Sequence, residues 1–582
     1  MKNYKKVYAA FILAGGLILH GCNGIFDDLA INPNQPSMGA YFTSPSAVND
    51  AVMTMYGYIS TQRCLGASGS KTTIIRSDEA SSNSDYGKPG MFGADLNASY
   101  YTIEQPYTLM YTTASQASYI IETAPSVDFS GNEELRNAYM GEAYFWRAFA
   151  HYYLLINFRN ISPIRQMPRN GDDYVRPLEK PAAVWDFIQE DLAHAKELLP
   201  VKGYWDSKNA GRVTKASAAA LLGKAYLYRS GIEQYYGEDK TTFYSEAAKE
   251  FGDVIDGKYG TYDLTKNYAD NFDVAHENNE ESILEFQFLG DVDNAGFNPG
   301  LATSGLAFDS RGLMLPGAGV GYEGVVHNWL YNAFVNSVDK DGYTDIRMFS
   351  TMIFNDLDAS IHLRNDAGGN PVRLEGPGGY KWEELYPAKN GKEGFATVSN
   401  PLAHSFKAGI RKGIDCSMPT QTEADGTPKL VGVGAGVKEY VYNQPRAHGV
   451  NWRYIRYADV LMMYAESVVS GGTPASNMTP LQAVNKVRGR ANMSELPSVT
   501  MTDIQNERIL EFALEGHRFY DLLRWGKLAS RFTELQESDP NFKKFISADD
   551  FKGFVTNKHE WLPIPINEVN SNPYITENNP GY

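Results

Sequence analysis

Apolar residues recur every three to four positions in several segments of the chain, which is the pattern of amphipathic helices. The first such segment follows Ser44, a residue type that often caps a helix, and Pro45, which fits the first helical turn. A second runs without proline from Asn132 to Phe158. The same period predicts further helices over residues 181–199, 215–230, 243–256, 454–469 and 479–491. The chain is therefore predicted to be mainly α-helical.

The spacing within residues 215–256 resembles the tetratricopeptide signature, in which two helices form a closely packed pair. Leu222, Gly223 and Tyr226 are followed by Ala247 and Phe251. Small Gly and Ala positions let the helices approach, while the aromatic rings fill the space between neighbouring pairs. Because one such unit cannot bury its own apolar face, we expect the other helices to stack on it in a solenoid-like core.

Two parts of the chain interrupt this pattern. Residues 66–100 are rich in Gly, Ser, Asn and Asp and are predicted to form a long loop, and long loops are often functional. Residues 285–445 are rich in turn residues, with short alternating runs typical of strands, such as SILEFQF at 282–288 and KEYVYN at 438–443. We therefore expect a large, irregular, loop-rich insertion with a few short strands. The helical blocks on either side would span residues 41–284 and 446–582.

The N-terminus has the layout of a bacterial secretion signal. Three lysines precede an apolar run from Val7 to Leu19, which is shorter than the about 20 residues that span a bilayer. Residues 1–21 are therefore predicted to be a signal peptide. Cys22 lies where a lipoprotein carries its lipid, and residues 22–40 would then form a lipidated, flexible tether. The alternative is an ordinary signal peptide that is cleaved elsewhere, with Cys22 an incidental thiol.

Composition narrows the possible partners. The formal net charge is −16 and no Lys/Arg-rich run offsets it, so nucleic acid is not expected as a partner. Apart from Cys22, the chain has only Cys64 and Cys416, which form either one disulfide or two buried thiols. The 38 Tyr, 28 Phe and 8 Trp residues supply aromatic faces for stacking on sugar rings as well as for the core.

Motifs for nucleotide binding, metal binding and catalysis are weak or absent. GVGYEG at residues 319–324 matches the glycine pattern of dinucleotide sites, but no βαβ unit is predicted around it. DKDGYTD at residues 339–345 alternates carboxylates without the final glutamate of an EF-hand, so we interpret it as an acidic turn. P-loop, zincin and hydrolase nucleophile signatures do not occur. No cofactor, metal site or catalytic residue is therefore predicted.

Three glutamates spaced four apart, Glu507, Glu511 and Glu515, would share one face of a helix. Paired carboxylates are the machinery of glycoside hydrolysis. Arginines are interleaved with these glutamates among apolar positions, and charges in such a setting more often form ion pairs that fix how helices dock. We therefore interpret the glutamates and the nearby His517 as structural residues. A glycoside hydrolase is the rival hypothesis.

The C-terminal third, taken in order, resembles the SusD/RagB family of Bacteroidetes outer-membrane lipoproteins. The resemblance rests on RYADVLMMYAESV, VNKVRGRA, ERILEFALEGHRFYDLLRWGKL and WLPIPINEVNSNP, with AYFWRAFAHYYLLINF in the N-terminal half. It implies a non-catalytic cell-surface protein, anchored in the outer membrane by lipid, with a scaffold of tetratricopeptide-like helix pairs. Such a protein captures an oligosaccharide, or a peptide, for a SusC-like TonB-dependent transporter.

In members of this family that bind glycans, ligand contacts tend to come from the loop after the first helix and from the insertion. The matching segments of this chain contain aromatic rings that would stack on sugars and polar side chains that would pair with hydroxyls. The predicted glycan-binding residues are Tyr86, Phe92, Tyr322, Trp329, Asn83, Asp85 and Asp95. The alternatives are that Phe92 and Trp329 are core residues, or that the surface binds another protein and no small ligand.

Overall fold

The computed structural model of the protein describes residues 42–82, 92, 96–288, 308–309, 316, 324–376, 379–398, 401–412, 432–433, 437–438, 447–539 and 553–582. Helices dominate these residues and the strands among them are short. The predicted fold class, mainly α-helical with a few short strands, is confirmed. The predicted signal peptide, the tether and Cys22 lie outside the described residues.

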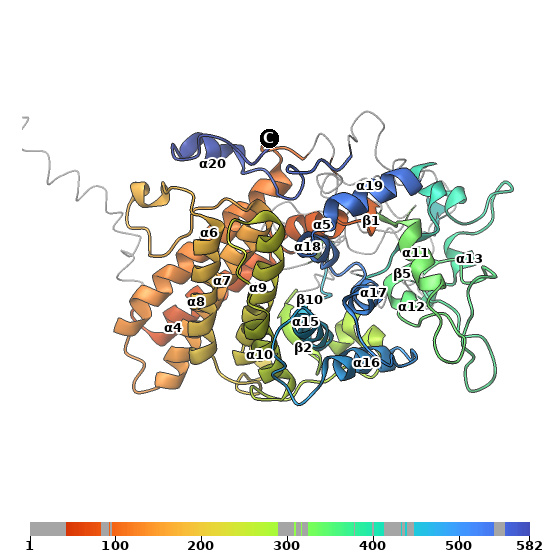
Figure 1. Ribbon diagram of the computed structural model, residues 1–582, viewed down its shortest axis with the longest axis horizontal. Helices are drawn as coiled ribbons and strands as arrows, with labels where there is room; N and C mark the ends of the chain where they lie inside the picture. The colour runs from red at the N-terminus through yellow and green to blue at the C-terminus, as the bar shows by residue number, and fades with distance from the viewer. Residues whose placement is uncertain are drawn as a thin grey trace, which may run out of the picture.

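Helices in the first half of the chain stack on one another in chain order. From α6 to α10 each helix packs against the next, and α4 packs against α6 and α7. Figure 1 shows α4, α6, α7, α8 and α9 as neighbouring rods on its left side. The helices of this half are α4 (Pro45–Ser60), α5 (Ser68–Ile75), α6 (Tyr101–Thr123), α7 (Glu133–Phe158), α8 (Pro181–Leu198), α9 (Lys215–Tyr236) and α10 (Tyr244–Ile255).

The close approach of α9 and α10 depends on Gly223. A Cβ atom at this position would come within 2.7 Å of the Phe251 ring, which is fully buried. Ala247, one turn before Phe251 on α10, is fully buried as well. A small residue on one helix therefore receives an aromatic ring from the other, as the tetratricopeptide-like spacing predicts.

The C-terminal helices continue the stack. Helix α15 packs against α10 and then against α16 and α17, while α18 returns to contact α9. The buried apolar side chains of both halves form one continuous core. The helices of this part are α15 (Tyr457–Val469), α16 (Pro480–Arg490), α17 (Met501–Glu511), α18 (Arg518–Arg524), α19 (Leu528–Ser538) and α20 (Ile566–Ser571).

Residues between the two helical parts carry short helices and strands. Strands β2 (Ser282–Phe286) and β10 (Trp452–Arg456) pair antiparallel, so the chain leaves the helical scaffold and returns to it at one place. The elements between them are α11 (Asn328–Val335), α12 (Met348–Thr351), α13 (Trp382–Leu385), β3 (Phe308–Asp309), β4 (Gly324–Val326), β5 (Met352–Phe354), β6 (Ala408–Ile410), β7 (Gly432–Val433), β8 (Val437–Lys438) and β9 (Ala447–His448). Figure 1 shows α11, α12, α13 and β5 at its right side.

A four-stranded antiparallel sheet joins the N-terminal part to this middle region. Its order is β1–β4–β6–β5, and β1 (Ala80–Ser82) is its only strand from the first hundred residues. Cα pairing places Ser82 opposite Gly324. The sheet therefore brings residues 82 and 324, which are far apart in sequence, side by side.

The prediction of a long loop over residues 66–100 is wrong, because α5 and β1 lie within it. Every residue of α5 is buried although most are polar. The hydroxyls of Thr72 and Thr73 donate to the carbonyls of Ser68 and Gly69 at 2.7 and 2.6 Å, so these polar groups are satisfied within the helix. Helix α6, with Pro106 inside it, was also not predicted.

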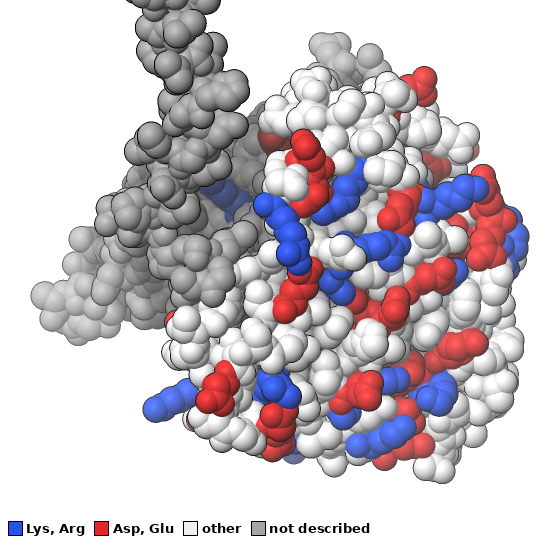
Figure 2. Space-filling model, turned by 90° about the vertical axis from the view of Figure 1, so that its left-hand side faces the viewer, with Lys and Arg blue, Asp and Glu red and all other residues white. Residues whose placement is uncertain are grey.

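Charged side chains of both signs are interspersed on the face that Figure 2 shows, which lies at the left of Figure 1. The negative net charge of the chain is therefore not gathered into one patch on the described residues of this face. The Cys64 thiol is free and buried, and burial raises its pKa. Cys416 lies outside the described residues.

Candidate functional site

A cleft of about 500 Å³ lies between α11, α17, α18 and α19, within the size range of ligand sites. Trp329, on the first turn of α11, forms part of its wall. Amide, hydroxyl, ammonium and carboxylate side chains lie around the indole. The lining residues are Trp329, Ala333, Gln505, Asn506, Ile509, Arg518, Leu522, Trp525, Lys527, Ser530, Arg531 and Glu534.

Trp329 is half-buried and held in one orientation. Its indole Nε1 donates to the carbonyl oxygen of Asp78 at 2.5 Å. The guanidinium carbons of Arg531 and Arg518 lie 4.3 and 5.4 Å from the ring centroid, which is cation–π distance. The indole is thus fixed before any ligand arrives, and it offers the cleft the part of its surface that the arginines leave open.

The Asp78 carboxylate positions both of these arginines. Its Oδ1 accepts from Arg518 Nε at 2.9 Å and its Oδ2 from Arg531 Nε at 2.6 Å. Burial alone would raise the pKa of Asp78, but the charges and hydrogen bonds of Arg518 and Arg531 outweigh it and hold the pKa below its usual value. Asp78 is therefore ionised and anchors the α18–α19 side of the cleft.

His327 completes the support beneath Trp329. Its Nδ1 lies 2.7 Å from the Asp78 carbonyl, which can only accept, so Nδ1 carries the proton. The Ser81 hydroxyl then donates to Nε2 at 2.6 Å. Burial lowers the pKa of His327, which keeps the ring neutral near pH 7. Both backbone and side chain of Asp78 are thus used to fix the aromatic wall of the cleft.

Among the predicted glycan-binding residues, the structure describes only Trp329 and Phe92. Asn83, Asp85, Tyr86, Asp95 and Tyr322 lie outside the described residues, and so do residues 319–323 of the GVGYEG motif. Ser82 and Gly324, the described residues next in sequence to Asn83 and to residue 323, are opposed in the β1–β4 pair.

Phe92 is a core residue in the structure. It is 4% exposed, stacks on His559 at a centroid distance of 5.0 Å, and contacts the Phe532 and Phe554 rings edge-on. No face of this ring is therefore open to a sugar in this conformation, because its neighbours on α19 and near the C-terminus cover it.

The interpretation of Glu507, Glu511 and Glu515 as ion-paired structural residues is confirmed. Glu511 contacts Arg347, Arg456 and Arg490, and all four side chains are almost fully buried. Glu515 binds Arg456 and Lys412, each at 2.9 Å. Glu507 binds Arg347 and Arg488. These carboxylates hold cations in the core, and they do not line the Trp329 cleft.

The acidic turn predicted at residues 339–345 is also confirmed. Asp339 Oδ1 accepts from the backbone N–H groups of Asp341 and Tyr343, at 2.8 and 3.0 Å. Arg364 neutralises the same carboxylate. Among the described residues, no group of three or more His, Cys, Asp or Glu side chains is arranged to hold a metal ion.

The sequence did not indicate that Arg518 and Arg531 line this cleft, or that Asp78 holds both of them. The contact between Asp78 and Arg531 spans 453 positions of the chain, so local spacing carries no trace of it. The sequence analysis predicts only that arginines near Glu507, Glu511 and Glu515 form ion pairs. Asp78 lies within residues 66–100, which the sequence predicts to be a loop, so no pattern indicates that its carboxylate is buried.

Two family models match the chain. The model described as "SusD family" matches residues 422–582, and the model described as "Starch-binding associating with outer membrane" matches residues 31–227. Together they cover more than half of the chain, one at each end.

Known proteins match most of this chain in sequence or in fold. A SusD-like protein of Bacteroides ovatus is 25% identical over 533 residues, which is 90% of this chain and 83% of the relative. A SusD superfamily protein from Bacteroides vulgatus superposes with a TM-score of 0.66 at 22% identity and covers 93% of this chain and all of the other. Surface glycan-binding protein A from Bacteroides thetaiotaomicron, in complex with laminarihexaose, gives a TM-score of 0.64 at 18% identity, with 92% and 100% covered. The chain is a member of the SusD-like family.

Proposed function

We propose that the protein captures glycans at the cell surface and delivers them to a SusC-like TonB-dependent transporter, without catalysing their cleavage. The observation that carries the proposal is the Trp329 cleft, where a fixed indole lies among hydrogen-bonding side chains. Sugars need this combination because their C–H faces pack on aromatic surfaces while each hydroxyl requires a polar partner. The solved relative that holds laminarihexaose supports a glucan oligosaccharide as the first ligand to test.

The description of a matching family model and the N-terminal sequence support a lipid-anchored location in the outer membrane. The description of one matching family model refers to association with the outer membrane. Among the described residues, no helix is both long enough and apolar enough to cross a bilayer. A lipid on Cys22 would tether the protein and keep it close to a transporter, which raises its effective concentration there.

The binding part of the proposal is tested by calorimetry with laminarin and starch oligosaccharides, and with a peptide panel for the alternative ligand class. Trp329→Ala should weaken glycan binding about tenfold or more, the effect expected when a central aromatic contact is removed. Tyr574→Ala removes an aromatic ring that is 57% exposed and lies outside the cleft, so it should leave affinity unchanged.

Trp329→Phe keeps a ring but loses the indole donor to Asp78, so an intermediate affinity is expected. Thermal unfolding of each variant shows whether the fold is intact. Equal affinity of wild type and Trp329→Ala would remove the cleft as the binding site. New reducing ends after incubation with any bound glycan would contradict the non-catalytic role.

A further inference from the structure

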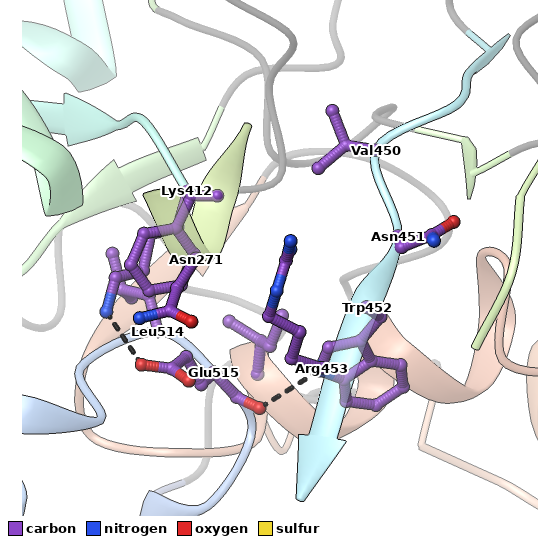
Figure 3. Close-up of a pocket in the computed structure, with 10 residues that line it drawn as sticks. Asn271, Lys412, Val450, Asn451, Trp452, Arg453, Leu514 and Glu515 are labelled. Carbon is purple, nitrogen blue, oxygen red and sulfur yellow. Dashed lines mark hydrogen bonds and ion pairs between the residues drawn. The ribbon is translucent and has the colours of Figure 1, made fainter. Parts of the chain in front are cut away.

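A second, smaller pocket lies at the start of β10, and none of its lining residues belongs to the Trp329 cleft. Its walls come from distant parts of the chain and include Ile74, Asn271 and Leu514. Figure 3 shows the Arg453 side chain extending from β10 into the space between Lys412 and Val450.

Arg453 is 3% exposed, and two of its guanidinium nitrogens, Nε and Nη1, have no hydrogen-bond partner. Its Nη2 donates to the carbonyl oxygen of His276 at 2.9 Å, and its Nε forms an ion pair with Glu285 Oε2 at 3.5 Å but no hydrogen bond. Buried polar groups in native proteins are nearly always hydrogen-bonded, so an exception at a pocket indicates a missing acceptor.

The other polar groups of the pocket already have partners. Lys412 Nζ donates to Tyr268, to the Ala513 carbonyl and to Glu515, which uses all three of its protons. The Trp452 indole donates to the Glu515 carbonyl at 3.3 Å, as Figure 3 shows. The Asn451 amide donates to Glu285 and Gln287. Arg453 therefore supplies the donors of this pocket that lack a partner. A ligand bound in the pocket would have to accept hydrogen bonds from them.

The volume of the pocket and the charge of Arg453 limit which ligands could bind there. The cavity volume of about 40 Å³ holds a few atoms, since one water needs about 10–15 Å³ and a sugar ring is far larger. Both Glu515 oxygens are held by Lys412 and Arg456, so that carboxylate does not serve Arg453. Oxyanions form stronger hydrogen bonds with a guanidinium than neutral acceptors do.

We propose that this pocket is a subsite for a small oxyanion, a carboxylate or a sulfate, which accepts hydrogen bonds from Arg453 Nη1. The oxyanion is either a free anion or an acidic substituent on a larger saccharide, and both present the same oxygen atoms to the arginine. This inference stands on the pocket alone and does not require the proposed glycan capture at Trp329.

Thermal unfolding of the purified protein in acetate or sulfate, with chloride keeping the ionic strength constant, tests the proposal. An anion that binds the folded state raises the unfolding temperature with concentration. Wild type should show a saturable shift, and Arg453→Gln should need about tenfold more anion for the same shift. Because sulfate stabilises proteins generally by exclusion, the difference between the two proteins is the signal.

Arg229→Gln is the matched control, since Arg229 is also buried with an unpartnered Nε but lies on α9, outside this pocket. It should retain the wild-type response. Glucuronate compared with glucose and acetate distinguishes the two sources: glucuronate binding more tightly than acetate indicates a saccharide substituent, and acetate alone binding indicates a free anion. Identical responses of wild type and Arg453→Gln would overturn the proposal.

A second measurement does not depend on the variant folding. Wild-type crystals soaked in selenate should give an anomalous selenium peak beside Arg453 Nη1. Water alone at that position, with selenate present in the soak, would also overturn the proposal.

Discussion

The α6–α10 helices and the α15–α18 helices use buried charges in different ways. In the first group, ion pairs join neighbouring helices, as where Arg147 on α7 binds Asp191 on α8 with two bonds of 2.7 Å. Next to the second group, one charge serves several carboxylates: Arg456, the last residue of β10, binds Glu281, Glu511 and Glu515 at once. An ion pair between two helices helps to define how they dock, while apolar packing already holds them together. A network fixes three segments relative to one another.

The largest effects are expected when one arginine is removed from each arrangement. Arg456→Met and Arg147→Met should each destabilise the protein by about 3–5 kcal/mol, because a buried carboxylate loses its counter-charge. Adding Asp191→Leu to Arg147→Met should bring stability back to within about 1 kcal/mol of wild type, since an apolar pair replaces the ionic one. Denaturant unfolding measures both effects.

The same kind of double substitution should not restore stability in the network around Arg456. In Arg456→Met with Glu511→Leu, the Oε1 of Glu281 and the Oε2 of Glu515 keep no donor, because Arg456 is the residue that bonds them. Stability should therefore stay low in this double variant. Full recovery would show that the network is no more than a set of independent pairs. Lys180→Met, in an exposed ion pair, serves as the control and should change stability by no more than about 0.5 kcal/mol.

A further effect is expected at Glu79, a buried carboxyl next to β1 that contacts the segment between α17 and α18. Its Oε1 accepts from the Leu514 N–H group at 3.1 Å, beyond the end of α17. Burial, and then the charge of Asp78, raise the pKa of Glu79 to about 8. The folded state therefore holds a proton that the unfolded state has released above about pH 4.5.

Stability should accordingly fall as pH rises from about 4.5 to about 8, by roughly 4 kcal/mol at most from this group. Glu79→Gln keeps the neutral shape, so it should lose this part of the pH dependence and exceed wild type in stability above pH 8. Denaturant unfolding at several pH values measures the difference. Glu238→Gln, at a side chain that is 89% exposed, should follow wild type. Parallel pH curves for wild type and Glu79→Gln would contradict the assignment.

The smallest effect concerns packing between α9 and α10. Gly223→Ala places a methyl group against the Phe251 ring and should cost about 1–2 kcal/mol despite the better helix propensity of alanine. Phe251→Leu in the same protein should reduce the penalty of the alanine, because the ring is what it meets. Gly57→Ala in α4 is the matched control. A Cβ at this position would have no atom from outside its own stretch of helix within 4 Å, so stability should rise by about 0.5–1 kcal/mol. Equal thermal shifts for both glycine variants would contradict the close-approach role.

The recurrence of apolar residues every three to four positions predicted the long helices well, because each of them buries one face, or all faces, over many turns. Helix α4 begins at Pro45 after the Ser44 cap, and α7 covers Glu133 to Phe158, as expected from the sequence. Helix α5 was not predicted because most of its buried residues are serine, threonine, lysine and glycine, and their burial depends on the elements packed around them. A residue's burial is a property of its neighbours in space, so local polarity was misleading there.

The candidate site was also predicted only in part. The sequence analysis named Trp329 as a glycan-binding residue, and the structure places its side chain on the wall of a cleft. The support for that residue was not predicted, because Asp78, Arg518 and Arg531 meet only after β1, α18 and α19 have packed. Which face of the indole remains open to a ligand is decided by those arginines.

Spacing along one helix, or between adjacent helices, was enough to predict the helical scaffold, the pairing of α9 with α10 and the ion pairs of Glu507 and Glu511 on α17. The folded structure was needed to show that Phe92 is covered, that Trp329 is held by Asp78, and that Arg453 has guanidinium nitrogens without an acceptor. Those features depend on contacts between residues hundreds of positions apart, and such contacts exist only once the chain has folded.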